Sequence, residues 1–558
     1  MENEVMENKI IDISRFTGLT ALELFREAIK YCREHPQTTL RIPPGEYILR
    51  DPAAVRLMDN VMSGKLGTNP QDRIFRPYFP YARGLDLSSC RDLTIEGYGA
   101  RLICDGWMEP LSIDRCQNIT VKGLTIDYLR KPYSVGTVID AGAGYYDVEF
   151  PARYPVNAGM PSPRIYRYSI EKARFEGDGW DCDRKEVVAG QIIRFYGSQP
   201  ELTAGATICV WHGFHFRPAI LINESVNTAL LDVTIHSQPG MGIVGHRSEN
   251  IRLERLRIVP EAGEYLSVNT DATHFTSCKG DLCLEGCQFE GQGDDSLNVH
   301  NYYYTILGRR GSTCEIAVRD ADAHAQVLDY PDPSDTLELV DAETLSPVRT
   351  YQVLSVENHP DQWQSTLVLD ADLPEATDAD ADAATDPAAA VANFYLINTT
   401  RLPRLRFLNC HVRNHRSRGV LIKTRQALVE GCTFDGCTGT AVHVAAEGGW
   451  HEGPASAQVT IRNNRMLRCG RAMRGSDLDV CGICVNIDAP VADTPGLHRD
   501  ITIENNIIVG DQSTCGIYVS CADDVSIRFN EISGCSQPVI VRHSSNVTVL
   551  ENPIRQVP

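Results

Sequence analysis

Long apolar runs are missing from this sequence of 558 residues: no segment approaches the roughly 18 apolar residues that a membrane-spanning helix needs. The N-terminus, MENEVMENKI, also lacks the basic and apolar regions of a secretory signal peptide. Positive charge is scarce too, because 53 Lys and Arg residues stand against 73 Asp and Glu residues, a net charge of −20. We therefore expect no membrane or nucleic-acid partner, and a cytoplasmic location unless a signal was trimmed from a secreted or periplasmic protein.

Cysteine motifs are also rare. Nineteen cysteines in a chain of this length are far below the density of a disulfide scaffold. Cys481-Gly-Ile-Cys484 has the spacing of a redox or zinc motif, but no second cysteine pair accompanies it. We expect most cysteines, including these two, to be small buried residues in a reducing compartment.

What is present is the composition of a globular protein, with 42% apolar and 23% charged residues. A helix is predicted from about Ala21 to Glu34. Thr20 and Glu23 form a capping box, and the apolar stripe consists of Leu22, Phe25, Ala28, Ile29 and Cys32. Such a helix ahead of a long β region can cover the open end of a stacked sheet, whose unpaired backbone groups would otherwise invite aggregation.

Short strands preceded by Asn or Asp recur at a nearly constant spacing. The repeated positions are Leu93 and Ile119, Ile235 and Ile258, Val412 and Phe434, and Ile503, Ile527 and Val549, with shifts of 22 to 26 residues. A period of this length, made of strands, indicates a β-solenoid, and the missing LxxLxL pattern excludes leucine-rich repeats. We predict an all-β fold: a right-handed parallel β-helix whose coils stack at about 4.8 Å.

Two stretches, 133–216 and 302–403, break this period. They contain β-branched and aromatic residues between Gly and Pro turns, and we interpret them as inserted, barrel-like β-domains. The second contains the acidic Glu375–Ala392, which we interpret as an exposed loop or a disordered link. The predicted division is 1–132 for the cap and first coils, 133–216 for the first insertion, 217–301 for the coils with the candidate acids, 302–403 for the second insertion and 404–558 for the C-terminal coils.

The segment Val268–His300 carries the main candidates for chemistry. Asp271 precedes Asp294 and Asp295 by 23 and 24 residues, which is one coil period. The three carboxyl groups should therefore lie on neighbouring coils. That placement suits cleavage of a glycosidic bond, which uses two carboxyl groups about 5–5.5 Å apart for retention or about 6.5–9.5 Å apart for inversion of configuration.

Strict strand alternation would send Asp294 and Asp295 to opposite faces, but Gly291 and Gly293 allow the backbone to bend there. Like charges so close together should raise the pKa of at least one carboxyl group, as a general acid requires. Two other interpretations exist. The aspartates could simply end strands or cap turns, or they could bind calcium as in β-helix lyases, although no Lys or Arg stands beside them on the same coils.

Polar residues near the acids are candidates for binding a sugar through hydrogen bonds or ring stacking. They are Asn269, His274, Asn298 and His300 around the acids, and Arg418, Lys423, His443, Glu447 and Trp450 further along the same face. Each of the second group could equally be an ordinary surface residue, and Trp107 is equally compatible with the core.

An Asn-Thr-Asp followed one coil later by Asp-Asp resembles the polygalacturonases. The Gly-His-Gly and Arg-Ile-Lys signatures of that family are not matched, although Arg418–Lys423 approximates the latter. A closer resemblance covers nearly the whole chain and is to glycoside hydrolase family 110, the exo-acting α-1,3-galactosidases that remove blood-group-B-type galactose. Its motifs are MSGKLGTNP at Met62–Pro70, GYGARLICDGWMEP at Gly97–Pro110, GLTIDYLRKPYSVG at Gly123–Gly136, and NTDATHF and GDDSLNVHN around the acids.

The resemblance implies an inverting hydrolase that needs neither a metal nor an organic cofactor. Asp271 would be the general acid, and Asp294 and Asp295 would position and deprotonate the attacking water. The substrate would be an oligosaccharide or glycoconjugate, either the branched B antigen or also linear α-1,3-galactosides. The alternatives are a polygalacturonase-like hydrolase of uronates and a non-catalytic glycan-binding β-helix. The oligomeric state is open, and a homodimer is compatible with the sequence.

Overall fold

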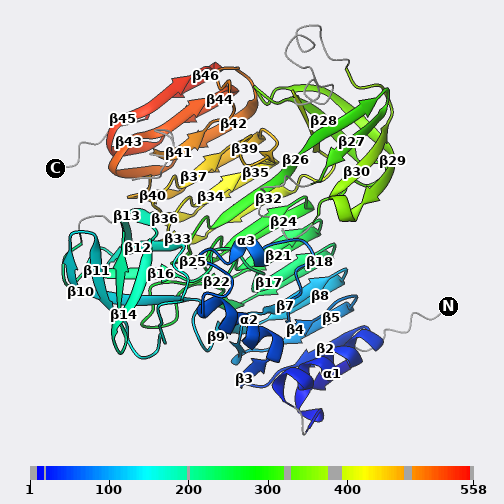
Figure 1. The fold of residues 1–558 in the computed structure, drawn as a ribbon. Helices are drawn as coiled ribbons and strands as arrows, with labels where there is room; N and C mark the ends of the chain where they lie inside the picture. The colour runs from blue at the N-terminus through cyan, green and yellow to red at the C-terminus, as the bar shows by residue number, and fades with distance from the viewer. Residues whose placement is uncertain are drawn as a thin grey trace.

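The computed structural model describes residues 9–17, 20–197, 202–318, 328–374, 393–470 and 481–552. Its strands wind into a tall stack that rises from helix α1 (Ala21–Glu34) to strand β46 (Ser545–Leu550), and two smaller sheets project from its sides (Figure 1). The predicted loop Glu375–Ala392 lies outside the described residues. No helix among those residues is long and apolar enough to cross a membrane.

Three ladders of parallel strands form the stack, and most coils contribute one strand to each. The first ladder contains thirteen strands. They are β1 (Lys9–Asp12), β2 (Thr38–Arg41), β5 (Arg91–Glu96), β8 (Gln117–Lys122), β18 (Val226–Leu231), β21 (Glu249–Glu254), β24 (Lys279–Glu285), β32 (Arg404–Leu408), β35 (Arg425–Glu430), β39 (Ala457–Arg462), β42 (His498–Glu504), β44 (Ala522–Arg528) and β46.

The second ladder carries the candidate acids. It runs through β4 (Arg83–Asp86), β7 (Glu109–Asp114), β17 (Ile220–Asn223), β20 (Ile243–His246), β23 (Thr273–Thr276), β26 (Leu297–Arg310), β34 (Val420–Ile422), β37 (Val442–Val444), β41 (Cys481–Val485), β43 (Ile507–Ser520) and β45 (Glu531–Arg542). Its strands are buried on both faces at several rungs, as expected for parallel strands.

The third ladder closes each coil. It consists of β3 (Gly45–Arg50), β6 (Ala100–Asp105), β9 (Thr125–Tyr128), β19 (Thr234–Ile235), β22 (Arg257–Ile258), β25 (Gln288–Glu290), β33 (His411–Arg413) and β36 (Thr433–Asp435), followed by β40 (Arg465–Leu467), β43 and β45. The register matches the period seen in the sequence. Leu93 pairs with Ile119, Ile235 with Ile258, Val412 with Phe434, Ile503 with Ile527, and Ile527 with Val549.

Side chains of one kind stack along the core. Phe407 lies between Phe289 and Phe434, with ring centroids 6.1 and 6.2 Å apart. All nineteen cysteines are free, and Cys481 and Cys484 are buried, as expected for packing residues. Such ladders arise because equivalent positions of successive coils face the same interior layer.

Helix α1 begins and ends where the sequence predicts. Thr20 and Glu23 form the capping box, and the five residues of the predicted stripe are its buried residues. Four of them, Phe25, Ala28, Ile29 and Cys32, pack into the main hydrophobic core below the first coils, so the helix covers the N-terminal end of the stack (Figure 1). The 3-10 turn η1 (Ile13–Arg15) precedes α1, and two further helices, α2 (Pro52–Met62) and α3 (Gln71–Ile74), follow it. A second 3-10 turn, η2 (Pro360–Gln362), lies in the second insertion. Trp107 is also core, with 1% of its surface exposed.

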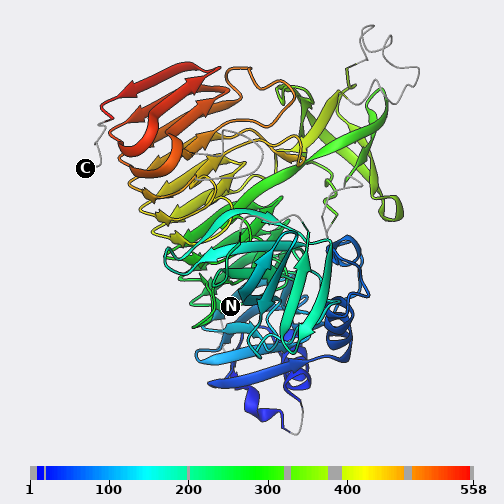
Figure 2. The same cartoon turned by 60° about the vertical axis from the view of Figure 1, so that its left-hand side comes forward.

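The first insertion is an antiparallel sheet of seven strands (cyan in Figures 1 and 2). These are β10 (Tyr133–Gly142), β11 (Tyr145–Glu149), β12 (Arg164–Ser169), β13 (Arg174–Trp180), β14 (Arg184–Ala189), β15 (Ile192–Tyr196) and β16 (Thr207–Trp211). Among the described residues its order runs from β13 to β14 without a pairing between those two strands, so it is an open sheet rather than the barrel we expected. Two apolar clusters on it explain why it folds as a unit.

The second insertion is a barrel. Strand β26 continues from the coil into it and pairs on either side with β27 (Thr313–Ala317) and β31 (Phe394–Asn398). The circle is completed by β30 (Gln364–Leu369), β29 (Pro347–His359) and β28 (Thr336–Asp341), which also pairs with β31. Closure leaves no free edge, and it ties the barrel directly to the strand that follows the acids.

Candidate active site

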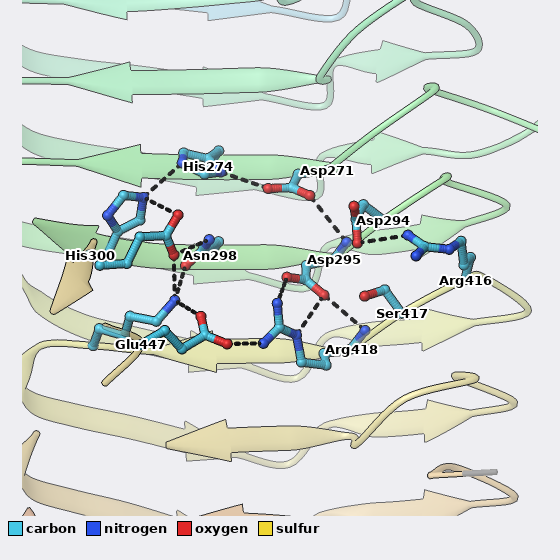
Figure 3. Close-up of polar contacts among 12 residues, drawn as sticks. Asp271, His274, Asp294, Asp295, Asn298, His300, Arg416, Ser417, Arg418 and Glu447 are labelled. Atoms are coloured by element: carbon cyan, nitrogen blue, oxygen red, sulfur yellow. Dashed lines mark hydrogen bonds and ion pairs between the residues drawn. The ribbon is translucent and has the colours of Figure 1, made fainter. Parts of the chain in front are cut away.

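The three candidate acids lie at the turns that lead into two stacked strands. Asp271 precedes β23, while Asp294 and Asp295 precede β26, and Thr273 of β23 pairs with Leu297 of β26. One oxygen of each carboxyl group lies within 4.8 Å of the others (Figure 3). The backbone N–H of Asp295 also donates to Asp271 Oδ1 across 3.2 Å. Stacking of successive coils therefore gathers the three carboxyl groups into one cluster.

Two glycines make the turn before Asp294 possible. Gly291 has a φ of +70°, in the left-handed region that favours glycine. A Cβ atom at Gly293 would lie 2.0 Å from the carbonyl oxygen of Asn269, which is far inside van der Waals contact. Glycine at both positions thus lets the chain bend tightly against the previous coil.

Arginines from the following coil hold the pair of aspartates. Arg418 reaches Asp295 with Nε 3.1 Å from Oδ1 and Nη2 3.0 Å from Oδ2, and its backbone N–H donates to Oδ1 at 2.9 Å. Arg416 Nη1 lies 3.1 Å from Asp294 Oδ1. In the sequence these arginines stand more than 120 residues after the acids, because the second insertion separates the two coils.

A row of alternating charges continues from Arg418. Its Nη1 lies 2.7 Å from Glu447 Oε1, and Lys423 Nζ lies 2.5 Å from both Glu447 Oε2 and Glu452 Oε2. Lys423 is completely buried, so these contacts replace the water that a charged amine would otherwise need. Asn298 joins the row through its amide, which donates to Glu452 Oε2 at 3.2 Å.

Two histidines extend the network from Asp271. His274 Nδ1 lies 2.6 Å from Asp271 Oδ2, and its Nε2 lies 2.9 Å from His300 Nε2 (Figure 3). His300 Nε2 is in turn 3.4 Å from Glu452 Oε1. A chain of polar contacts therefore joins four successive coils, in the order His300, His274, Asp271, Asp295, Arg418, Glu447, Lys423 and Glu452.

This environment separates the acidities of the three aspartates. Burial raises the pKa of Asp271 to about 7, the positive charge of His274 opposes the rise, and the charges of Asp294 and Asp295 add to it. Burial also raises the pKa of Asp294, against the opposing charge of Arg416. Burial acts on Asp295 too, but the charge and hydrogen bonds of Arg418 outweigh it and hold the pKa of Asp295 below its ordinary value. Asp271 can thus carry a proton near neutrality beside Asp295, whose ionised form Arg418 stabilises.

Two groups have ligand atoms close enough for a metal ion: the three aspartates, and His274 with His300 and Glu452. In both groups a lysine or arginine side chain of the protein forms an ion pair with a carboxylate. Lys423 is bonded to Glu452, and Arg418 is bonded to Asp295 through both carboxylate oxygens. These contacts are those of ion pairs that orient the acids.

Most predicted binding residues belong to the same network. Asp271, His274, Asp294, Asp295, Asn298, His300, Arg418, Lys423 and Glu447 lie in it, and His443 is close enough for its charge to lower the pKa of Glu447. Asn269 instead lies beneath it, where its amide donates to the carbonyl oxygens of Gly213 and Pro132 at 2.5 and 3.3 Å. Trp450 differs again, with 65% of its surface exposed.

Arg416, Glu452 and two aromatic residues of the first insertion lie in or beside this network but were not among the predicted site residues. Arg416 and Glu452 have no repeat pattern that would mark them, because one lies in a turn and the other in the short strand β38 (Glu452–Gly453), which pairs with β26. Aromatic residues of the first insertion also lie beside Arg416, the partner of Asp294. The guanidinium of Arg416 lies 5.7 Å from the ring of Tyr166 and 5.9 Å from that of Phe214. Only the folded insertion reveals that proximity.

A hollow of about 870 Å³ lies away from the acids, between α1, α2 and β4. Its lining includes Arg26, Asp51, Tyr81, Arg83 and Trp107, and none of the three aspartates. We take the aspartates, rather than this hollow, as the candidate active site. Burial, the raised pKa of Asp271 and the ion pairs around Asp294 and Asp295 are features that mark candidate catalytic groups.

Solved structures resemble the whole chain only at low similarity. An exopolygalacturonase from Thermotoga maritima superposes with a TM-score of 0.43 and 11% identity, over 98% of this chain and 92% of its own. A mannuronan C-5 epimerase module from Azotobacter vinelandii superposes with a TM-score of 0.40 and 12% identity, over 98% and 99% of the two chains. No protein-family model matches the sequence.

Characterised proteins match much of the chain in sequence. Alpha-1,3-galactosidase B of Bacteroides thetaiotaomicron is 25% identical over 552 residues, covering 90% of this chain and 83% of its own. Alpha-1,3-galactosidase B of Bacteroides fragilis is 27% identical over 83% of this chain and 80% of its own, and alpha-1,3-galactosidase A of Shewanella woodyi is 24% identical over 98% and 91%. The chain is therefore a homologue, at about 25% identity over most of its length, of the α-1,3-galactosidases A and B of glycoside hydrolase family 110, which confirms the resemblance that its sequence motifs indicated.

Proposed function

We propose that this protein is an exo-acting, inverting α-1,3-galactosidase built on a right-handed parallel β-helix. It releases terminal α-1,3-linked galactose from blood-group-B-type glycans, from linear Galα1-3Gal, or from both. One observation carries the proposal: a buried carboxyl group whose pKa is raised to about 7, Asp271, lies beside Asp295, whose pKa is lowered, and the more accessible Asp294. A pair of carboxyl groups with separated acidities is what hydrolysis of a glycosidic bond requires.

Asp271 acts as the general acid. Its proton passes to the glycosidic oxygen as the bond from that oxygen to the anomeric carbon breaks, and the electron pair of the bond stays with the oxygen. Asp271 then bears a negative charge, which the His274 ring nitrogen at 2.6 Å and the Asp295 N–H at 3.2 Å stabilise by hydrogen bonding.

Asp294 is the base that accepts a proton from the attacking water, and Asp295 orients that water. Asp294 has the most exposed carboxyl group of the three, with 24% of its side chain accessible, and its raised pKa makes it the stronger base. Asp295 is a weaker base because Arg418 stabilises its ionised form. Its fixed position instead provides an acceptor for the second hydrogen of the water.

The charges favour a neutral sugar over a uronate. A uronate carboxylate would need a cation with capacity to bind it. Among the described residues around the acids, Arg416 pairs with Asp294, Arg418 with Asp295 and Glu447, and Lys423 with Glu447 and Glu452. Removing one of these cations from its buried partner would leave a carboxylate uncompensated, at a cost of about 3–5 kcal/mol. This argues against the polygalacturonase-like alternative.

Both insertions lie where they can limit the site to one terminal sugar. The first places Tyr166 and Phe214 beside Arg416. The second leaves the coil through β26, and Tyr302 at its root pairs with Glu452. Walls on two sides of the acids are consistent with an exo-acting enzyme and with the predicted division of the chain into coils and insertions.

A panel of three substrates tests the proposal: linear Galα1-3Gal, the fucose-branched B trisaccharide and pectin. We expect free galactose from at least one of the first two and no uronate from pectin. Release of galacturonate from pectin without release of galactose would instead establish the uronate hydrolase. Binding of a glycan without any product, unchanged by Asp271→Asn, would establish a non-catalytic β-helix.

A further inference from the structure

The contact between His274 and His300 requires a proton in a defined place. Their Nε2 atoms face each other at 2.9 Å. The Nδ1 atom of His300 lies 3.1 Å from the backbone carbonyl oxygen of Asn301, which can only accept, so Nδ1 carries the hydrogen, and in the neutral ring Nε2 of His300 has a lone pair. The hydrogen between the two rings must then belong to His274 Nε2.

The other nitrogen of His274 also needs a hydrogen. Its Nδ1 lies 2.6 Å from Asp271 Oδ2, an acceptor whenever Asp271 is ionised. His274 is thus doubly protonated, and positively charged, in the state that follows proton donation by Asp271. Burial alone would lower the pKa of His274, but the hydrogen bond and charge of Asp271 raise it above its ordinary value.

His300 is suited to the role of a neutral acceptor. It is 1% exposed, and burial lowers its pKa to about 3, so it does not compete with His274 for the proton. The charged groups that act on the two rings come from three parts of the fold. They are Asp271 at the turn before β23, Lys423 after β34, and Glu452 in β38.

We propose that His300 is a positioning residue that keeps His274 protonated, and that His274 in turn orients Asp271 and stabilises its charge after the proton has left. The inference rests on the proposed function, since it assigns the groups behind the acid of that same site. His300 acts only through His274, and it lies one residue layer away from the carboxyl groups.

The β-helix provides a matched control. His246, Thr276 and His300 occupy equivalent positions on three successive coils, because His246 pairs with Thr276 and Thr276 with His300. The imidazole of His246 is as deeply buried as that of His300 and bonds to Thr276 Oγ1 at 2.8 Å; it lies one coil before His274 and two coils before His300. A leucine at 246 therefore removes a buried imidazole of the same ladder without touching the dyad.

The test compares His300→Leu, His300→Gln and the control His246→Leu. Leucine cannot accept the hydrogen of His274 Nε2, so His274 becomes neutral and the pKa of Asp271 rises. We expect the alkaline limb of kcat/KM for Galα1-3Gal to move up by about one pH unit, and kcat to fall at least about tenfold. Glutamine, which keeps an acceptor oxygen, should restore most of both values. His246→Leu should leave the pH profile unchanged.

A loss of kcat in His300→Leu with an unshifted profile, or the same loss in His246→Leu, would overturn the proposal in favour of packing alone. Nitrogen-15 NMR of the histidine rings provides a readout independent of turnover. It should show His274 protonated on both nitrogens at pH 8, where Asp271 is ionised, in the wild type and in His300→Gln, and on one nitrogen in His300→Leu. A singly protonated His274 in the wild type would contradict the dyad even in an active enzyme. The expected NMR pattern without galactosidase activity would refute only the proposed function.

Discussion

Arg418 binds Asp295 through three nitrogen atoms: the backbone N and Nε lie 2.9 and 3.1 Å from Oδ1, and Nη2 lies 3.0 Å from Oδ2. The guanidinium fork matches both carboxylate oxygens, and its third contact, to Glu447, prevents it from rotating. Lysine offers a single charged atom and cannot reproduce this arrangement.

We therefore expect Arg418→Lys to lower kcat by about 100-fold, because a small displacement of Asp295 misplaces the water. The Tm should also fall, since a buried pair loses much of its geometry. The measurement is steady-state hydrolysis of Galα1-3Gal together with thermal unfolding. Arg413→Lys is the control, because Arg413 pairs with Glu290 at the surface with 61% of its side chain exposed, and it should behave as wild type. Full activity of Arg418→Lys would remove this arginine from the mechanism.

The three aspartates should respond differently to substrates with different leaving groups. Asp271→Asn removes the proton donor, so hydrolysis of Galα1-3Gal should fall by about 10²–10⁴-fold. A dinitrophenyl α-galactoside, whose leaving group needs no proton, should be affected far less. Asp294→Asn should impair both substrates equally, because both require an activated water. The surface variant Asp232→Asn, which alters only the contacts of Asp232 with Arg255 and Tyr98, should match wild type. Equal losses of Asp271→Asn on both substrates would exclude it as the acid.

Activity on glycans should decline above neutral pH. Asp271 is active while protonated, and its pKa of about 7 lies well above the ordinary value for an aspartate, so kcat/KM should fall as pH rises through about 7. Asp295 has a lowered pKa and should remain ionised over the whole working range. The measurement is kcat/KM for Galα1-3Gal from pH 4 to 9, with the dinitrophenyl galactoside as a reference that needs no acid. A rate that stays constant up to pH 9 would contradict the assignment of Asp271.

The stack of phenylalanines in the core should contribute to the free energy of unfolding, because it joins successive coils. Phe407 is fully buried between Phe289 and Phe434, and Phe407→Ala should reduce the free energy of unfolding by about 3–5 kcal/mol. Chemical denaturation measures this loss. Phe529→Ala is the control: Phe529 is 48% exposed, and its replacement should change stability by less than about 1 kcal/mol. Similar losses in both variants would show that the predicted ladder does not form a core.

The coil, its period and its capping helix could be predicted because each has a local pattern. The capping box at Thr20 and the spacing of Ile503, Ile527 and Val549 are visible along the chain, and the strand register follows them. The closeness of Asp271 to Asp294 and Asp295 is a consequence of the same period. These features depend on residues one coil apart, so the sequence places them side by side.

The network behind the acids could be predicted only in part. Arg418 and Lys423 were candidates as sugar-binding residues, but their contacts with Asp295 and Glu452 depend on the coil that returns after the second insertion. Glu452 and Tyr166 reach the site from a short antiparallel strand and from the first insertion. No periodicity relates such residues to the acids, and tertiary packing alone brings them together.

The configuration of the first galactose released from Galα1-3Gal tests the account most directly. A single displacement by water activated at Asp294, opposite the acid Asp271, must invert the anomeric carbon. Proton NMR during the first minutes of the reaction, before mutarotation, should therefore show β-galactose. Release of α-galactose would contradict the single displacement by these coil-spaced aspartates.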